Sequence, residues 1–194
     1  MGIKEKILED GDELHKFIIL LANANGESIK GRLKLQKMMY LLSDKIEVIK
    51  EQSSYDADNY GPYSEVVDEE EQYLEQIGVL TSSPGEIALT KTGKEIAQEL
   101  YKNEDEKTLK VLNEYKKFLN DLTSNELLAY IYSAYPDMTE ESVEYENLKP
   151  NMENHILSLI RKQKISSQRA AELLSRPQDY IIKKMKDRRM AVLR

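Results

Sequence analysis

Cationic side chains gather in the last forty residues of this 194-residue chain. Residues 155–194 hold eleven Lys or Arg and three acidic residues, which gives this segment a formal charge of +8. The whole chain carries −7, so the remaining residues carry −15. Lys and Arg contact nucleic-acid phosphates and displace their counterions. A charge asymmetry of this kind therefore indicates either polyanion binding or pairing of opposite charges within the chain.

If this basic segment binds DNA, we expect Gln178, Lys183 and Lys184 to reach base edges in a groove. The other cations close to them would contact phosphates. These are Arg169, Arg176, Lys186, Arg188 and Arg189. The alternative is a solvated helix face whose cations pair with the acidic remainder of the chain.

A second group of four cations lies in the predicted helix over residues 28–42, and these residues are further candidates for DNA contact. They are Lys30, Arg32, Lys34 and Lys37. The acidic run at 68–71 would repel phosphate if it shared their face. DNA binding and protein binding are therefore both open for this part of the chain. The acidic run itself is typical of a solvated helix face, because adjacent helical positions fan around the axis.

The sequence offers little for catalysis or metal binding. It has no cysteine, and neither of its two histidines, His15 and His155, has a second ligand three or four residues away. The glycine motifs of phosphate-binding loops and nucleophile elbows are absent from the sequence. We therefore expect a non-enzymatic protein without cofactor or metal. Tyr60 and Tyr63 flank a Gly-Pro pair that either forms a partner-binding loop or simply shapes a turn.

The first half of the chain predicts three helices, a hairpin and a fourth helix. The first helix begins at a capping Asp12 and has Leu14, Phe17, Ile18 and Leu21 on one face. The second carries Leu35, Met38, Met39 and Leu42 on one face, and the third runs from about 62 to 77. Two short apolar runs at 79–81 and 87–89 flank turn formers and predict a two-stranded wing, with a helix at 94–100 after it. This order is typical of a winged helix-turn-helix unit, here over residues 10–102.

The second half has no glycine after Gly93 and should be almost entirely helical. A charged bridge at 102–107 leads to a helix with a stripe of Val111, Tyr115, Phe118 and Leu122. Thr123 and Glu126 have the spacing of a capping box. Residues 137–150 are the expected connector to three short helices at 152–162, 166–174 and 177–190.

The predicted fold class is mostly α: a winged helix-turn-helix body with a small two-stranded β wing, plus a C-terminal helix-turn-helix segment. The tight turn at 174–177 joins the last two helices, and the later one would enter a major groove. We expect three parts: a winged-helix-like domain at 1–102, a helical extension and connector at 103–150, and a basic helix-turn-helix-like segment at 151–194.

Two stretches carry a family resemblance over roughly residues 10–145. The run KLQKMMYLL at 34–42, followed by YGPYS at 60–64, resembles the pattern of YwgA-like proteins and, more distantly, of Panacea-type domains found in some antitoxins. Residues 128–136, LAYIYSAYP, are similar to the tail of the same group.

A third stretch, KISSQRAAELL at 164–174, resembles the core of short helix-turn-helix proteins described as VapB-like antitoxins. Gln163 and Ser175 stand where that family has glycine. Together the resemblances imply a prokaryotic regulatory or antitoxin-like protein.

The longest apolar run, residues 17–22, is far too short to span a bilayer, and the first residues lack the pattern of a secretory signal. We expect a cytoplasmic protein that does not bind membranes. The predicted function is a DNA-binding transcriptional regulator or antitoxin, which forms a homodimer on operator DNA and binds a cognate toxin. The alternative is a protein-interaction adaptor that does not bind DNA.

Overall fold

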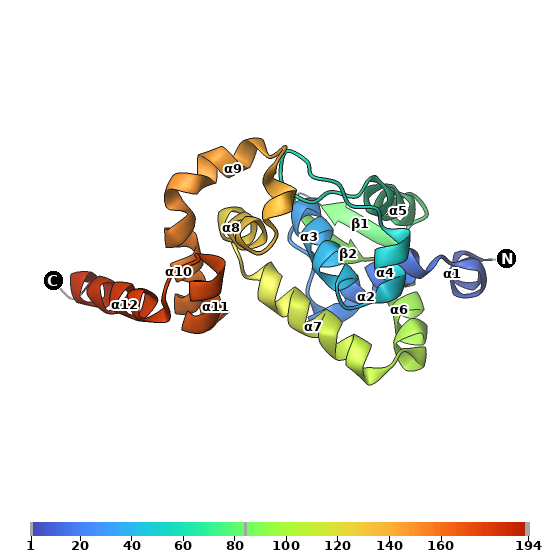
Figure 1. Ribbon diagram of the computed structural model, residues 1–194. Coiled ribbons are helices and arrows are strands. Elements are labelled where there is room, and N and C mark those ends of the chain that lie inside the picture. Colours follow the sequence, from blue (N-terminus) through green and yellow to red (C-terminus); the bar gives the residue numbers. More distant parts are fainter. Residues whose placement is uncertain (1, 84, 193–194) are drawn as a thin grey trace. The chain divides into compact units, whose positions relative to one another are not determined.

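The computed structural model describes residues 2–83 and 85–192, with the side chains of residue 10 and of residues 188–192 left out of the description. The described chain is mostly helical and has one small two-stranded antiparallel sheet (Figure 1). It divides into two compact units. Unit 1 comprises Met1–Asp56 and Pro62–Asp121, and unit 2 comprises Ala57–Gly61 and Leu122–Arg194.

Unit 1 contains seven α-helices, one 3-10 turn and the sheet within its described residues. In chain order they are α1 (Ile3–Asp10), α2 (Glu13–Asn23), η1 (Ala24–Gly26), α3 (Arg32–Ser43), α4 (Glu47–Gln52), α5 (Glu65–Gln76), β1 (Leu80–Ser83), β2 (Glu86–Leu89), α6 (Lys91–Asn103) and α7 (Glu106–Asn120). The short helices α1 and α4 were not expected from the sequence.

The core of unit 1 forms around α2. Asp12 caps this helix by accepting a hydrogen bond from the Leu14 backbone N–H at 2.8 Å. Every residue of the apolar run from Phe17 to Ala22 is buried, because α2 packs against α4, α5, α6, α7 and β2. The expected inward face is confirmed, and the helix is also buried on its other sides, as an apolar helix surrounded by partners must be.

The predicted hairpin is confirmed. Strands β1 and β2 pair antiparallel, with Leu80 opposite Leu89 and Ser83 opposite Glu86. An isolated bridge between Ile29 and Ile87 extends the pairing on the other side of β2. Ile29 and Ile87 are both buried, so the hairpin closes one side of the unit 1 core.

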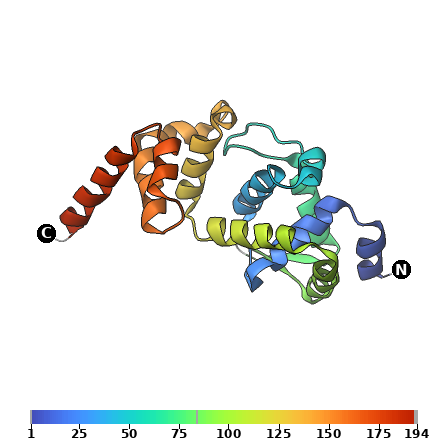
Figure 2. The same ribbon diagram turned by 60° about the horizontal axis from the view of Figure 1, so that its bottom comes forward.

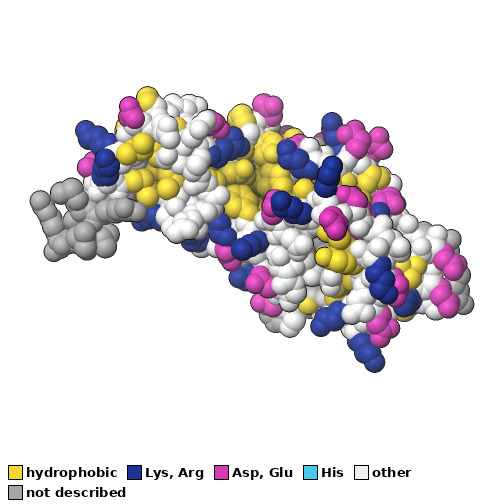
Figure 3. Space-filling model, turned by 90° about the horizontal axis from the view of Figure 1, so that it is seen from below, with side chains coloured by type: hydrophobic (Ala, Val, Ile, Leu, Met, Phe, Trp, Pro, Cys, Tyr) yellow, Lys and Arg dark blue, Asp and Glu magenta, His cyan; other side chains and the backbone are white. Residues whose placement is uncertain are grey.

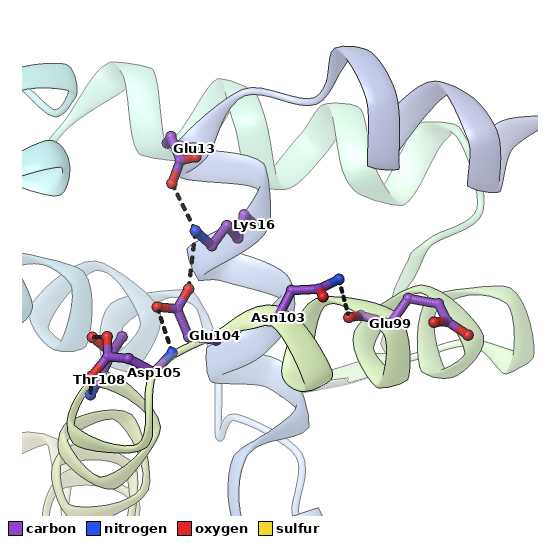
Figure 4. Close-up of polar contacts among 7 residues, drawn as sticks. All are labelled: Glu13, Lys16, Glu99, Asn103, Glu104, Asp105 and Thr108. Atoms are coloured by element: carbon purple, nitrogen blue, oxygen red, sulfur yellow. Dashed lines mark hydrogen bonds and ion pairs between the residues drawn. The ribbon is translucent and has the colours of Figure 1, made fainter.

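The charged bridge between α6 and α7 is a tight corner. Asp105 caps α7 by accepting from the backbone N–H groups of Lys107 and Thr108. Figure 4 shows the Lys16 ammonium of α2 between Glu13 and Glu104, at 3.1 and 2.9 Å from their carboxylate oxygens. Burial disfavours the charged form of Lys16, but the hydrogen bonds that its ammonium donates to the two carboxylates, together with their charges, outweigh it and raise its pKa.

The buried face of α7 differs from the predicted stripe. Leu109, Leu112, Lys116 and Leu119 are buried, whereas the predicted Val111, Tyr115 and Phe118 are half-buried. Two apolar stripes run along this helix, and the one that packs in unit 1 includes a lysine. Because lysine is normally exposed, the sequence favoured the stripe without it.

Unit 2 is built around α8, and its described part is helical apart from its turns and residues 57–61. Its elements are α8 (Ser124–Ala134), η2 (Pro136–Thr139), α9 (Val143–Leu148), η3 (Lys149–Asn151), α10 (Met152–Arg161), α11 (Ser167–Leu173) and α12 (Gln178–Val192). The stretch expected as a connector, 137–150, thus holds most of η2, all of α9 and the start of η3. The expected middle segment, 103–150, is shared: α7 lies in unit 1 and α8 in unit 2.

Loop residues 57–61 are fastened inside unit 2. The Ser142 hydroxyl donates to the Asn59 carbonyl at 2.8 Å and lies 2.5 Å from the Tyr132 hydroxyl. Gly61 has φ +77, and a Cβ there would meet the Tyr132 ring at 2.9 Å. Glycine is therefore required at this point for both its backbone angle and its small size.

Two helix ends in unit 2 use non-glycine residues with left-handed backbone. Gln163 has φ +57 after α10, and Ser175 has φ +50 after α11. In each case two backbone hydrogen bonds close the helix end, as in the Schellman motif. Gln163 and Ser175 are the two positions at which the VapB-like resemblance has glycine.

No helix in the described part of the chain has the length and apolar character to cross a membrane.

Candidate nucleic-acid interface

Helices α11 and α12 form the surface that the sequence singled out for DNA binding. Ser166 caps α11 by accepting from the Arg169 backbone N–H at 3.0 Å. Ala170 and Ala171 are buried, and such small side chains let neighbouring helices approach closely. A four-residue turn, 174–177, then joins α11 to α12, which packs against it. Pro177 directly precedes α12, where its fixed φ suits the start of a helix.

One face of α12 is exposed and the opposite face is anchored. Ile181 is fully buried within unit 2. Within residues 178–187 the exposed positions recur at i, i+1, i+4, i+5, i+8 and i+9, which places them on one side of the helix. They are Gln178, Asp179, Ile182, Lys183, Lys186 and Asp187. Figures 1 and 2 both show the backbone of α12 extending beyond α10 and α11.

Tyr180 and Glu153 hold the beginning of α12 against α10. The Tyr180 hydroxyl donates to Glu153 Oε2 at 2.9 Å, and Lys184 Nζ lies 3.6 Å from Glu153 Oε1. Arg176 and Lys184 lie 5.8 and 5.4 Å from the Tyr180 ring centroid. The hydrogen bond to Tyr180 is the largest contribution to the raised pKa of Lys184. These contacts fix where α12 presents its cations.

The cations of this segment that were predicted to contact DNA, whether at base edges or at phosphates, fall into several groups. Arg176, Lys183 and Lys186 are exposed. Arg169 is exposed too, but its guanidinium lies 3.2 Å from the Glu172 carboxylate. Lys184 is half-buried beside Glu153. The side chains of the predicted Arg188 and Arg189 lie outside the described residues.

The N-terminal residue of α12 has a fixed side chain. Gln178 Nε2 donates to the Ser167 hydroxyl at 2.9 Å. Ser167 is the first residue of α11, so the starts of the two helices are joined by side chains. The sequence indicated Gln178 as a groove-reading residue but gave no sign of this partner.

In unit 1, two of the four predicted DNA-contacting cations are internal. The Lys34 ammonium donates to the Asn120 carbonyl at 2.6 Å, and the Lys37 ammonium donates to the Pro62 carbonyl at 2.7 Å. Their exposed fractions are 7% and 1%. Neither ammonium is therefore exposed to contact DNA as predicted, because both cations satisfy backbone carbonyls inside the unit. Lys34 lies at the C-terminus of α7, where the last carbonyls of a helix carry partial negative charge. That charge attracts the lysine ammonium.

The other two cations of this group are on the surface. Lys30 is exposed, and its backbone N–H donates to the Asn120 side chain at 3.0 Å. Arg32 places Nε 3.0 Å from Glu71 Oε2 and Nη2 3.3 Å from Glu75 Oε2. Burial raises the pKa of Glu71, and the Arg32 guanidinium opposes that rise. Arg32 is thus committed to carboxylates of α5.

The KLQK run has a structural role that sequence reasoning missed. The Gln36 side chain donates to the Ser64 carbonyl at 3.0 Å and accepts from the Ser64 backbone N–H at 3.0 Å. Lys37 binds the carbonyl two residues earlier, at Pro62. The two stretches that carry the YwgA-like resemblance therefore bind each other. Their pairing explains the spacing of polar residues on an otherwise apolar helix.

Helix α5 is strongly acidic. It holds six carboxylates and no Lys or Arg. It packs against α3 and β1, and its Glu71 and Glu75 lie beside Arg32 at the start of α3. On the face of the molecule drawn in Figure 3, Lys and Arg side chains are interspersed with Asp and Glu over unit 1.

Tyr60 and Tyr63, predicted to bind a partner together, belong to different units. Tyr60 is half exposed and lies in the segment held by unit 2. Tyr63 pairs with Asp56 through two backbone hydrogen bonds of 2.9 and 3.0 Å in unit 1. The prediction of a single recognition loop remains untested.

The described residues contain no group of three or more His, Asp or Glu side chains placed to hold a metal ion. His15 pairs with Glu70 and stacks on Tyr73 at 5.2 Å between ring centroids. These contacts join α2 to α5 and account for the histidine structurally.

Lys116 is a buried cation that the sequence did not single out. Its ammonium donates to the Ala22 carbonyl at 2.8 Å and to the Glu27 carbonyl, and the side chain is fully buried. Burial lowers its pKa to about 8, and the Glu27 charge acts in the opposite direction. Lys116 holds the end of α2 and the following turn against α7.

Comparison with known proteins adds no relative: no protein-family model, curated protein or solved structure matches this chain.

Proposed function

We propose that this protein is a non-enzymatic, DNA-binding regulator of the antitoxin type, and that α11 and α12 form its DNA-binding helix-turn-helix. The observation that carries the proposal is the exposed face of α12, with Lys183 and Lys186 outward and Ile181 buried behind them. In this arrangement α12 enters the major groove and α11 crosses the backbone.

The charges of unit 1 favour different roles for the two units. We propose a winged helix-turn-helix-like body in which α3 and α5 are the positions where a groove helix is expected. Lys34 and Lys37 of α3 are internal, and α5 carries six carboxylates, so neither helix offers phosphate a cationic face. DNA binding is therefore proposed for unit 2. Binding of a cognate protein such as a toxin, and homodimerisation, are proposed for unit 1.

One observation favours the alternative, an adaptor that does not bind DNA. Four carboxylates among the described residues of unit 2 already pair with cations: Glu126 with Lys162, Glu146 with Lys149, Glu172 with Arg169, and Glu153 with Lys184. If such pairing dominated the surface, little charge would remain for phosphate. The exposed Arg176, Lys183 and Lys186 favour DNA binding over this alternative.

The test is the affinity of the full chain for duplex DNA across a salt series. A duplex of about 30 base pairs holds two half-sites one helical turn apart. We expect log affinity to fall linearly with log salt, by about 0.9 per phosphate contact. The double charge reversal Lys183→Glu, Lys186→Glu should weaken binding and make this slope shallower by about 1.8.

The matched control is Lys107→Glu, Lys110→Glu on α7. Both of these lysines are exposed, and the change in net charge is the same. The control should bind DNA like the parent chain. If neither the parent nor the control retards DNA at low salt, the adaptor is the correct function. If both double variants weaken binding equally, the contact is not made by α12.

A further inference from the structure

The start of α12 carries a side chain whose hydrogen-bonding groups are held in one orientation. An exposed glutamine samples many rotamers, and ordering it reduces its conformational entropy. Here the Ser167 hydroxyl accepts from Gln178 Nε2 at 2.9 Å and selects one of them. The contact joins the first residues of α11 and α12, so the two helices orient the amide together.

The remaining groups of that amide match one base. A glutamine side chain has two N–H donors and an oxygen acceptor. Ser167 takes one donor, which leaves one N–H and the oxygen of the amide. In the major groove, adenine presents an N7 acceptor next to an N6 donor, and glutamine binds this pair through two hydrogen bonds. Guanine presents two acceptors there and cannot donate to the oxygen.

One helical turn further, α12 exposes an apolar side chain. Ile182 is 38% exposed, while its neighbour Ile181 is fully buried. Packing in unit 2 therefore accounts for Ile181 and leaves Ile182 on the same face as Gln178. The apolar feature of the major groove is the thymine methyl group.

We infer that Gln178, positioned by Ser167, reads an adenine in the major groove, and that Ile182 contacts a neighbouring thymine methyl. This inference rests on the proposed DNA binding by α12. It names Gln178 and Ile182 as specificity-determining residues and Ser167 as a positioning residue that does not itself touch the base.

The experiment begins with selection of preferred sites by the full chain from a randomised duplex library. The enriched site should contain an adenine next to a thymine. In that site, 7-deazaadenine removes the N7 acceptor and uracil removes the thymine methyl. We expect 7-deazaadenine to weaken binding by the parent chain about two- to twelvefold, the range for the loss of one of the two hydrogen bonds.

Four variants distinguish recognition of a base from general affinity for DNA. Gln178→Ala should bind the adenine and 7-deazaadenine duplexes equally, and Ile182→Ala should no longer distinguish thymine from uracil. Ser167→Ala should reduce the adenine preference, while Ser167→Thr, which keeps the hydroxyl, should restore it. The control Lys183→Ala should weaken binding to all duplexes alike.

The outcomes distinguish this inference from the proposed function. Absence of any DNA binding overturns both. Binding without an enriched sequence, or an adenine preference that survives in Gln178→Ala, overturns the inference and leaves DNA binding intact. A Ser167→Ala variant that keeps the parent preference shows that Ser167 does not position the amide.

Discussion

The Glu126 carboxylate lies 2.6 Å from the Lys162 ammonium, so the residue that closes the capping box of α8 also fastens α10. Its Oε2 accepts from the Thr123 backbone N–H at 2.8 Å, and its Oε1 accepts from the Ser158 hydroxyl at 2.6 Å. One carboxylate thus holds the start of one helix and two side chains of another. Helices α8 and α10 both pack against α11, so the placement of α11 and α12 depends on this carboxylate.

Unit 2 should lose stability in acid when Glu126 protonates. Burial opposes ionisation, but hydrogen bonds from Lys162, Ser158 and Thr123 outweigh it and lower the pKa of Glu126 from 4.5 to about 2. Because the folded pKa is the lower one, the stabilisation is fully present above the unfolded value. It is lost as the pH falls from about 4.5 to 2, and amounts to about 3 kcal/mol.

The variant that tests this is Glu126→Gln, compared with Glu141→Gln at an exposed position. Urea unfolding followed by circular dichroism should show a free energy of unfolding lowered by up to about 3 kcal/mol near neutral pH for Glu126→Gln alone. Near pH 3 the gap between that variant and the parent should narrow. A gap that stays constant with pH would contradict the assignment.

Lys116 should make unit 1 more stable as the pH rises. Its folded pKa of about 8 lies below the ordinary value of 10.5, so the unfolded chain binds more protons between these values. The free energy of unfolding should therefore increase by up to about 1.4 kcal/mol per pH unit in that range. The useful window is about pH 8 to 9.5, because desolvation raises the pKa of the half-buried Tyr55, which acts in the opposite direction above its ordinary value of 10.

The measurement is urea unfolding across this window for the parent, for Lys116→Met and for the exposed control Lys110→Met. The parent and the control should share the rising slope. Lys116→Met should lose it and be less stable overall, because the Ala22 and Glu27 carbonyls lose their donor. Equal slopes in all three proteins would exclude Lys116 as the source.

The internal lysines of α3 should matter for stability and not for DNA affinity. Replacing either Lys34 or Lys37 by Met keeps the length of the side chain but leaves a buried carbonyl, of Asn120 or Pro62, without its donor. We expect a loss of about 1–3 kcal/mol in the free energy of unfolding for each variant. The salt dependence of DNA binding, measured at a temperature where both variants are folded, should be unchanged.

A shallower salt slope in Lys34→Met or Lys37→Met would show that these cations reach phosphate after all. Lys183→Met on α12 is the positive control for that assay, and it should make the slope shallower by about 0.9. The comparison thus separates a cation that contacts DNA from one that holds the fold.

Local signals predicted much of the secondary structure. The capping box at Thr123 and Glu126, the hairpin after Gly78 and the turn before Pro177 each depend on a few adjacent residues, and all three occur in the structure. What could not be predicted is which cations are internal. Lys34 and Lys116 satisfy carbonyls 86 and 94 residues away, and a carbonyl leaves no mark in the sequence that identifies it as a partner.

The same limit applies to the candidate site. Charge and helix periodicity indicated α12 and three of its exposed residues, Gln178, Lys183 and Lys186. The pairing of Gln178 with Ser167 depends on how two helices cross, which spacing alone does not determine. The departure from glycine at Gln163 and Ser175 left the turns uncertain, and the structure shows that both residues adopt the backbone angle that glycine would supply.

Those two turns should become more stable when glycine is introduced. A non-glycine residue in the left-handed region is strained by about 1–2 kcal/mol, part of which is offset by the greater flexibility of glycine in the unfolded chain. We therefore expect Gln163→Gly and Ser175→Gly each to raise the free energy of unfolding of unit 2 by about 1 kcal/mol. The matched control, Gln168→Gly inside α11, should lower it by a similar amount. Thermal unfolding of the three variants should give opposite shifts for Gln163→Gly and Gln168→Gly, and equal losses for both would mean that the end of α10 does not adopt the left-handed conformation in solution.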